Sequence, residues 1–209
     1  MPRRRLDPDV VSRRLDLAIC LPAVIFLAPL LLAIAAVVFF GDGASPVFRQ
    51  RRIGRDGRPF DCLKFRSMTR DADARLVRLL AECPLARAEW ERDRKLRRDP
   101  RITTVGGFLR RSSLDELPQL FNVLRGEMSL VGPRPIVADE IARYGGRIGA
   151  YCAVRPGITG LWQVSGRSGT TYRRRVACDV VYVRRRGLAT DLRILAATVP
   201  AVLSARGSC

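Results

Sequence analysis

The strongest hydrophobic pattern in the chain is an uninterrupted apolar stretch over residues 17–40, which contains no charged side chain. It exceeds the roughly 20 apolar residues that a helix needs to cross the hydrocarbon core of a bilayer. It is also longer than the apolar region of a signal peptide, about 7 to 15 residues. We therefore predict a membrane helix over residues 17–40, preceded by a basic N-terminal arm over residues 1–16.

Arginines flank this helix on both sides, at positions 3, 4, 5, 13 and 14 before it and at positions 49, 51, 52, 55 and 58 after it. Because arginine-rich flanks stay on the cytoplasmic side, both ends are predicted to be cytoplasmic. Ala28 and Pro29 lie in the middle, where the proline removes a helical hydrogen bond and favours a bend. Two interpretations stay open: a re-entrant helix hairpin that returns to the same face, and an ordinary kinked span.

Alternation of polar and apolar positions begins only after this segment. Residues 47–54 and 60–68 are typical of two short strands joined by a tight Asp56-Gly57 turn. Residues 71–98 are dense in charges of both signs and predict exposed helix that Pro84 interrupts. The hairpin therefore follows the membrane segment directly, and a solvated helical stretch follows the hairpin.

Residues 192–203 mix aliphatic side chains with Arg193 and predict a helix that either packs on the core or lies on a membrane surface. Core packing is the commoner fate of such a helix. No repeat or long linker divides residues 41–209, which are predicted to form one cytoplasmic domain. The predicted fold class is α+β, with a re-entrant N-terminal membrane helix hairpin and a mainly helical domain that contains a short β-hairpin.

The amino-acid composition limits the kinds of catalytic and metal-binding site that the chain can form. The chain has no histidine, which excludes Ser-His-Asp and Cys-His nucleophile arrangements and histidine-ligated metals. None of its six cysteines forms a CxxC pair, so free thiols in a reducing compartment are expected. A net charge of +18 predicts a polyanionic partner, and nucleic acid, anionic lipid and phosphorylated substrates all satisfy that requirement.

Glycines, prolines, arginines and carboxylates are concentrated in residues 99–135. Ser113 to Glu116 fits a capping box, which would make the pattern merely the start of a helix. Whether the helix begins at this box or just after it, Asp115 and Glu116 lie at or just before the positive end of the helix dipole. A carboxylate there should stay ionised, as a nucleophile or a metal ligand must. Neighbouring residues do not face each other on a helix, so the two carboxyls are expected to have different roles.

Arginines accompany these carboxylates. Arg110 and Arg111 precede Asp115 by five and four residues, and Arg134 lies in a loop whose prolines, Pro133 among them, restrict its path. Arginines beside carboxylates suit a phosphorylated substrate bound through a divalent cation, but plain ion pairs between loops account for the same spacing. No Walker A motif or GxGxxG fingerprint is present.

The chain resembles the small monotopic phosphoglycosyl transferases of bacteria, also called initiating sugar transferases. The most specific motifs are DELPQL at residues 115–120 and SLVGPRP at residues 129–135. Further matching motifs include QRRIG at 50–54, KFRSM at 64–68 and DPRIT at 99–103. The resemblance covers nearly the whole chain in order.

This resemblance implies a bacterial inner-membrane enzyme with a re-entrant helix and a catalytic domain on the cytoplasmic face. Such enzymes move a phosphosugar from a UDP-sugar to a polyprenol phosphate, with Mg²⁺ as cofactor and release of UMP. Membrane lipid is a further expected partner, nucleic acid is not, and a homodimer is an assembly to test. We expect a ping-pong course through a covalent phosphosugar on Asp115.

Residue by residue, the resemblance assigns the nucleophilic aspartate, also the expected metal ligand, to Asp115 and its companion carboxylate to Glu116. Substrate-binding roles fall on Arg110, Arg134, Lys64 and Pro133.

Three departures from the family pattern stand out. Ala28 replaces the serine that often precedes the bend proline, Ser67 replaces a threonine, and residues 168–175 match less closely. A non-catalytic, basic, membrane-anchored protein that binds anionic lipid or nucleic acid is the alternative from another class, and a degenerate transferase retained as a scaffold is a third. The first of these explains the charge and the apolar segment but not the DELPQL and GPRP motifs.

Overall fold

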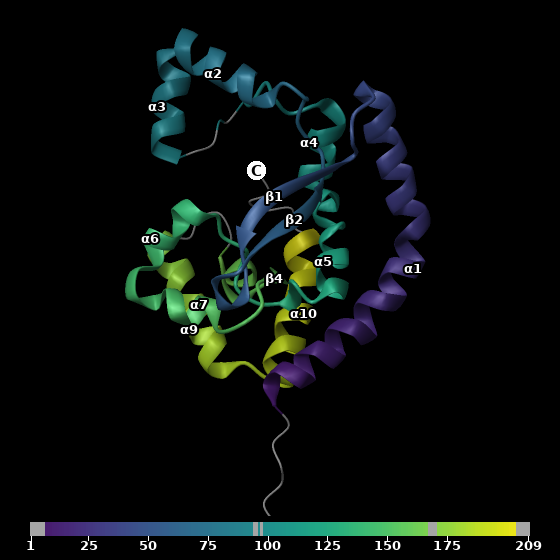
Figure 1. Ribbon diagram of the computed structural model, residues 1–209, viewed down its shortest axis with the longest axis vertical. Coiled ribbons are helices and arrows are strands. Elements are labelled where there is room, and N and C mark those ends of the chain that lie inside the picture. Colours follow the sequence, from purple (N-terminus) through teal and green to yellow (C-terminus); the bar gives the residue numbers. More distant parts are fainter. Residues whose placement is uncertain (1–6, 94–95, 97, 167–170, 204–209) are drawn as a thin grey trace, which may run out of the picture.

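The computed structural model describes residues 7–93, 96, 98–166 and 171–203. The predicted α+β class is confirmed: one long N-terminal helix lies along a largely helical domain that contains two small sheets (Figure 1). Residues 1–6 of the predicted basic arm and residues 168–170 of the less closely matching segment 168–175 lie outside the described residues.

The N-terminal helix α1 runs from Pro8 to Asp42. Asp7 caps it by accepting from the backbone N–H of Asp9, and Gly43 ends it in the left-handed conformation, with φ of 68°. The helix is continuous through Pro22 and Pro29 and changes direction along its length (Figure 1). It is long and apolar enough to cross a membrane, as residues 17–40 predicted, but it begins within the segment predicted as a separate arm.

One face of α1 packs on the domain along most of its length. Its buried residues recur at helical spacing and come from one stripe: Asp16, Cys20, Leu31, Ile34 and Val38. The other face is apolar and exposed, with Phe26 and Phe40 more than four-fifths exposed. The helix therefore covers the domain with one side and presents hydrophobic surface with the other.

The predicted β-hairpin is confirmed. Strand β1 (Val47–Ile53) pairs antiparallel with β2 (Pro59–Phe65), with Val47 opposite Phe65 and Ile53 opposite Pro59. The turn between them is the short 3-10 helix η1 (Arg55–Gly57), where Asp56 and Gly57 both have positive φ. An Asp-Gly pair suits this turn because both residues tolerate the left-handed region.

The exposed, proline-interrupted helix is also confirmed. Helix α2 (Ala72–Glu82) has no buried residue, and α3 (Pro84–Asp93) begins at the proline that interrupts the pattern. The two helices extend away from the rest of the domain (Figure 1). Proline suits the first position of a helix because that N–H has no intrahelical partner.

The site-bearing elements follow: α4 (Thr104–Arg111), the 3-10 turn η2 (Leu114–Glu116), α5 (Gln119–Arg125) and strand β3 (Ser129–Val131). Strand β3 pairs parallel with β4 (Gly157–Thr159). The remaining elements are η3 (Ala138–Glu140), α6 (Ile141–Tyr144), η4 (Gly145–Arg147), α7 (Ile148–Cys152), α8 (Leu161–Ser165), α9 (Tyr172–Arg185) and α10 (Leu188–Leu203).

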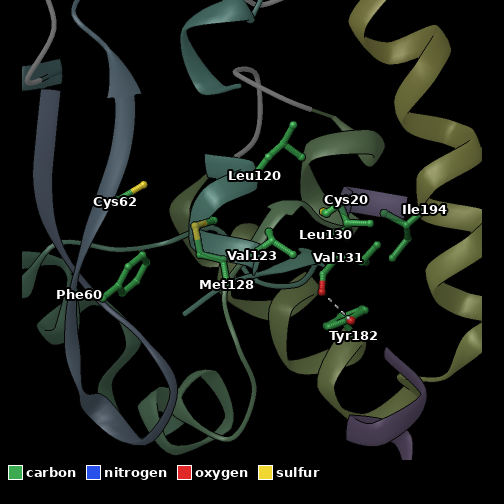
Figure 2. Packing of buried hydrophobic residues seen from close by; sticks show 10 residues of the cluster. All are labelled: Cys20, Phe60, Cys62, Leu120, Val123, Met128, Leu130, Val131, Tyr182 and Ile194. Atoms are coloured by element: carbon green, nitrogen blue, oxygen red, sulfur yellow. Dashed lines mark hydrogen bonds between the residues drawn. The ribbon is translucent and has the colours of Figure 1, made fainter. Parts of the chain in front are cut away.

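The main core joins both ends of the chain. Cys20 of α1 and Ile194 of α10 pack with α5 and β3 residues, and the Tyr182 hydroxyl donates to the carbonyl of Val131 at 3.0 Å (Figure 2). Helix α10 thus packs on the core, as expected for residues 192–203, while Leu192 and Val199 remain exposed on its other side. The cysteines in the described part of the chain are free thiols.

Candidate active site around Asp115 and Glu116

Helix α1 anchors the two elements that flank the site. Asp16 accepts hydrogen bonds from the Ser129 hydroxyl at 3.0 Å and from the Leu130 N–H at 2.8 Å, and so holds β3. Arg13 donates to the carbonyls of Val123 and Leu124 at the end of α5. The Val123 carbonyl also accepts from the Gly126 N–H at 2.9 Å, and the arginine adds a cation at the negative end of the helix. The helix is therefore a structural support of the site as well as an apolar surface.

The paired carboxylates lie on η2, just before α5. The predicted capping box is wrong, because Ser113 adopts a left-handed conformation with φ of 58° and its side chain makes no capping bond. The chain turns sharply at this serine instead of entering a regular helix. This turn directs the two neighbouring carboxyls into different surroundings.

Asp115 is buried, with 9% of its surface exposed, and makes no hydrogen bond or ion pair with any residue that the structure describes. Desolvation raises its pKa, Lys64 opposes the shift, and Glu116 adds to it. Arg110 and Arg134 also act on it and favour the ionised form. Burial therefore acts against the ionised form of Asp115, and the surrounding cations act in its favour.

Glu116 lies in an ion-pair network. Its Oε1 is 2.7 Å from Lys64 Nζ and 3.7 Å from Arg134 Nη2. Burial opposes its ionisation, but the charges of Lys64 and Arg134 outweigh this effect, and the pKa of Glu116 is lowered. The two adjacent carboxyls thus have pKa shifts of opposite direction, and Glu116 is already paired while Asp115 is not.

The other predicted site residues lie around this pair. Arg110, in the last turn of α4, donates from Nε to the Ser67 hydroxyl at 2.8 Å. Pro133 is fully buried, and its carbonyl accepts from the Gly157 N–H at 2.8 Å, which holds the loop that presents Arg134. Arg111, which the spacing placed beside Asp115, is exposed.

A cleft opens beside Glu116. It is lined by Lys64, Glu116 and Arg134, together with Arg52, Cys62, Gln119, Pro135, Gly157 and Ile158. Arg52 and Gln119 were not predicted as site residues, although each belongs to a motif quoted for the resemblance. Their positions depend on the approach of segments far apart in sequence, which residue spacing does not reveal.

The donor set is compatible with Mg²⁺ only if the substrate contributes. No group of three or more metal-ligating carboxylates, thiols or imidazoles occurs among the residues that the structure describes. Mg²⁺ is commonly held by one or two carboxylates together with substrate phosphates. Asp115, which has no protein partner within the described residues, and the adjacent Glu116 could supply the carboxylate part of such a site.

The chain is similar to known bacterial proteins over most of its length. ExoY of Sinorhizobium fredii, an exopolysaccharide production protein, is 48% identical over 95% of this chain and 88% of its own length. An undecaprenyl-phosphate galactose phosphotransferase of Salmonella typhimurium is 48% identical over 95% of this chain. A UDP-glucose:undecaprenyl-phosphate glucose-1-phosphate transferase of Caulobacter vibrioides is 40% identical over 97% of this chain and 73% of its own length.

Several relatives are longer proteins, and the chain spans 41% of the Salmonella relative and 43% of an uncharacterized sugar transferase of Haemophilus influenzae. The family model for bacterial sugar transferases matches residues 8–205, which include α1, the hairpin and the Asp115–Glu116 turn. With that match over nearly its whole length, the chain belongs to the bacterial sugar transferase family.

Proposed function

We propose that the protein transfers a sugar phosphate from a UDP-sugar to a polyprenol phosphate and releases UMP, the first membrane step of a glycoconjugate pathway. The observation that carries this proposal is the buried, unpaired carboxylate of Asp115, which lies among the charges of Lys64, Arg110 and Arg134. A polyanionic diphosphate needs such cations before a carboxylate can approach it. The printed names of the Salmonella and Caulobacter relatives support the same substrate classes.

Two displacements at phosphorus make up the proposed reaction. An oxygen of Asp115 forms a bond to the β-phosphorus, and the bond from that phosphorus to the bridging oxygen breaks, so UMP leaves with the electron pair. An oxygen of the polyprenol phosphate then attacks the aspartyl-linked phosphorus, and the Asp115 carboxylate leaves. Burial makes Asp115 a poorly hydrated nucleophile, while the surrounding cations offset the charge that develops on the phosphoryl oxygens.

Mg²⁺ belongs to this proposal as a cofactor held by Asp115 and Glu116 with oxygens of the substrate. It would supply further neutralisation of the diphosphate charge. Lys64 keeps Glu116 ionised through their 2.7 Å contact, which maintains a carboxylate next to Asp115 when the substrate arrives.

The membrane arrangement proposed is a re-entrant one on the cytoplasmic face of the bacterial inner membrane. It is supported by the packing of α1, because the stripe from Asp16 to Val38 is buried against the domain while the opposite face is apolar and exposed. A helix that crossed the bilayer away from the domain would leave this stripe unpaired. Single cysteines placed near Arg14 and near Arg58 in a cysteine-free background should both resist an impermeant reagent in intact cells, and labelling of either would contradict the arrangement.

The decisive experiment measures UMP release by the purified protein in nanodiscs, against a panel of UDP-sugars with Mg²⁺ and polyprenol phosphate. Wild type should release UMP with one of the sugars and Asp115→Asn should not, because an amide is a far weaker nucleophile than a carboxylate. Asp139→Asn, at an exposed aspartate of η3, is the matched control and should keep full activity. Undiminished UMP release by Asp115→Asn would refute the assigned nucleophile.

The same preparation separates this proposal from that of a non-catalytic binding protein. Such a protein would bind anionic vesicles or nucleic acid with an affinity that falls steeply with salt and does not depend on Asp115. A wild-type protein that is folded, silent with every UDP-sugar and salt-sensitive in binding would favour that alternative.

A further inference from the structure

One edge of strand β2 is bonded by a side chain instead of a further strand. The sheet consists of β1 and β2, so β2 has an edge that no strand pairs. Asn122 of α5 lies against β2: its Oδ1 accepts from the Leu63 N–H at 2.9 Å, and its Nδ2 donates to the Asp61 carbonyl at 2.8 Å. Residues two apart in a strand present an N–H and a carbonyl to the same edge, so the amide takes the place of a neighbouring strand.

Glu127 holds the Asn122 amide in this orientation. Its Oε2 accepts from Asn122 Nδ2 at 2.6 Å, so the amide nitrogen has two acceptors and the amide oxygen has a donor. Asn122 is fully buried. A reversed amide would place its NH₂ group against the Leu63 N–H and its oxygen against the Asp61 carbonyl, and both contacts would be lost. The side chain of Asn122 therefore fixes one position of the strand.

Asn122 and Glu116 belong to one continuous helical stretch. The turn η2 ends at Glu116, Leu117 and Pro118 keep right-handed helical backbone angles, and α5 begins at Gln119. Hydrogen-bonded helical backbone has a fixed rise and rotation per residue, so it transmits position over this short distance. A bond that holds Asn122 against β2 therefore also sets the position of Glu116 relative to β2.

On the strand, Lys64 directly follows the residue that Asn122 holds. Its Nζ lies 2.7 Å from Glu116 Oε1, and its side chain is only 18% exposed. The strand and α5 lie side by side (Figure 1) and also pack through Cys62 and Leu120 in the main core. Apolar packing is non-directional, whereas hydrogen bonds depend on both distance and angle, so the amide is the contact that fixes the strand in register.

From these contacts we infer that Asn122, oriented by Glu127, is a positioning residue that fixes Lys64 against Glu116. The inference rests on the proposed function, in which Lys64 offsets the charge of the diphosphate and keeps Glu116 ionised. Asn122 does not line the cleft and makes no hydrogen bond with Lys64 or Glu116, so it acts through the backbone of β2.

The test uses the full chain in nanodiscs with variants of the two residues. Glu127→Ala removes the acceptor that orients the amide, whereas Glu127→Gln keeps an acceptor of nearly the same size. Asn122→Asp keeps the acceptor for the Leu63 N–H but removes the donor to the Asp61 carbonyl, and it brings a second carboxylate towards Glu127. Glu127→Gln should therefore behave nearly as wild type, and the other two variants should not.

The first measurement follows Lys64 directly and needs no turnover. The chain contains two lysines, Lys64 and Lys95, so mass spectrometry after treatment with an amine-acylating reagent reports on Lys64, with Lys95 as the reference for reagent activity. The Glu116 carboxylate shields the Lys64 ammonium from the reagent. Glu127→Ala and Asn122→Asp should raise the relative acylation rate of Lys64 by about fivefold or more, because the hydrogen bonds that hold the pair together are weakened.

The second measurement is a double-mutant cycle on kcat/KM for UMP release. Glu127→Ala should lower kcat/KM by about tenfold in the wild-type background and by less than about twofold in a Lys64→Gln background, where there is no ammonium left to position. A purely structural loss would give the same factor in both backgrounds. Equal factors, or a Lys64 acylation rate that Glu127→Ala and Asn122→Asp leave unchanged, would overturn the inference.

Melting temperatures of all variants separate positioning from loss of fold. Tyr144→Phe is the matched control, because it removes a buried 2.7 Å hydrogen bond, to Asp179, outside the site. It should lower the melting temperature and leave the Lys64 acylation rate unchanged; a rise in that rate with Tyr144→Phe would show that acylation follows stability and would overturn the inference. If Asn122→Asp fails to fold, the two Glu127 variants carry the test.

Failure of this inference is distinguishable from failure of the proposed function. If wild type releases UMP in an Asp115-dependent way while Glu127→Ala changes neither acylation nor the cycle, only the positioning role is wrong. If wild type is silent with every UDP-sugar while Glu127→Ala and Asn122→Asp still raise the acylation of Lys64, the proposed function fails and the positioning of Lys64 by Asn122 stands.

Discussion

The Ser67 hydroxyl accepts a hydrogen bond from Arg110 Nε at 2.8 Å, which joins the residues after β2 to the last turn of α4. The backbone carbonyl of Ser67 also accepts from the Thr103 N–H, at 3.1 Å. Because Ser67 is buried, its hydroxyl fixes the orientation of the Arg110 guanidinium next to Asp115. The residue at the fourth position of the KFRSM motif therefore positions Arg110, an arginine of the proposed site.

Removal of the Ser67 hydroxyl should lower the turnover rate more than the affinity for the substrates. We expect Ser67→Ala to lower kcat by roughly tenfold, because one hydrogen bond to a charged group is lost. Ser67→Thr keeps a hydroxyl and should restore most of the rate. Steady-state kinetics on both variants test this, and equal losses in the alanine and threonine variants would point to a packing effect instead.

Gly106 allows α4 to lie close to the Ser67 backbone because it has no side chain. A Cβ at Gly106 would lie 2.0 Å from the Ser67 carbonyl oxygen, so Gly106→Ala should push α4 away from Ser67 and reduce both stability and activity. Gly107→Ala is the neighbouring control, because its Cβ would make only ordinary contacts, with Arg111 at 3.5 Å and Ile102 at 3.9 Å. Melting temperature and UMP release should fall for the first variant alone, because helix propensity favours alanine over glycine at both positions. A similar fall for both would mean that the close contact with Ser67 is not the cause.

Substitutions on the two faces of α1 should have different effects: on the buried face they should lower stability, and on the exposed face they should weaken membrane association. Leu31 is 8% exposed and packs near Phe65 and Leu109, whereas the adjacent Leu32 is 71% exposed. Leu31→Ala should destabilise the fold by about 2 to 5 kcal/mol, as for other buried leucines. Leu32→Ala should leave the melting temperature nearly unchanged in detergent and weaken vesicle binding. A reversal of the two effects would mean that the other face of α1 packs on the domain.

Asp179 should make stability depend on pH. It is buried in α9, accepts from the Tyr144 hydroxyl at 2.7 Å, and desolvation raises its pKa from 3.8 to about 7, against the opposing effects of Tyr144 and Arg175. Between about pH 4 and pH 7 the folded state therefore keeps a proton that the unfolded state has lost. Stability must fall as pH rises through that window, and above pH 7 the loss is on the order of 4 kcal/mol.

Asp179→Asn removes this titration while leaving an oxygen that can accept from Tyr144. The variant should be more stable than wild type at pH 8, and its advantage should vanish near pH 4. Thermal melts of both proteins across this range provide the measurement. Curves that run parallel with pH would show that Asp179 titrates near its ordinary value in the folded protein.

Structural features that depend on residues close together in the sequence could be predicted from the sequence. The run over residues 17–40 indicated α1, the Asp56-Gly57 pair indicated the hairpin turn, and Pro84 marked the break between two exposed helices. Each depends on local conformational preference or on continuous apolar character, and both are properties of the sequence itself. The motifs also indicated Asp115 and Glu116 as the reactive pair, and that assignment stays a prediction for the UMP-release experiment.

The local pattern failed at Ser113 and could not show contacts between distant segments. Ser113 has the sequence of a capping box, yet its backbone lies in the left-handed region just after α4 ends, and the chain turns sharply there. Nor could spacing show that Lys64, 52 residues before Glu116, pairs with it at 2.7 Å. Gln119 and Arg52 line the same cleft only because β1, η2 and α5 meet there.

Sequence alone determined which residues are available: an apolar helix, a basic chain without histidine, and adjacent carboxylates with arginines nearby. Tertiary structure decided how those groups differ. Asp115 and Glu116 are chemically similar neighbours, but one is desolvated without a partner and the other is paired with Lys64, so their pKa values shift in opposite directions. Desolvation and charge proximity depend on distances in space, and only the folded chain sets those distances.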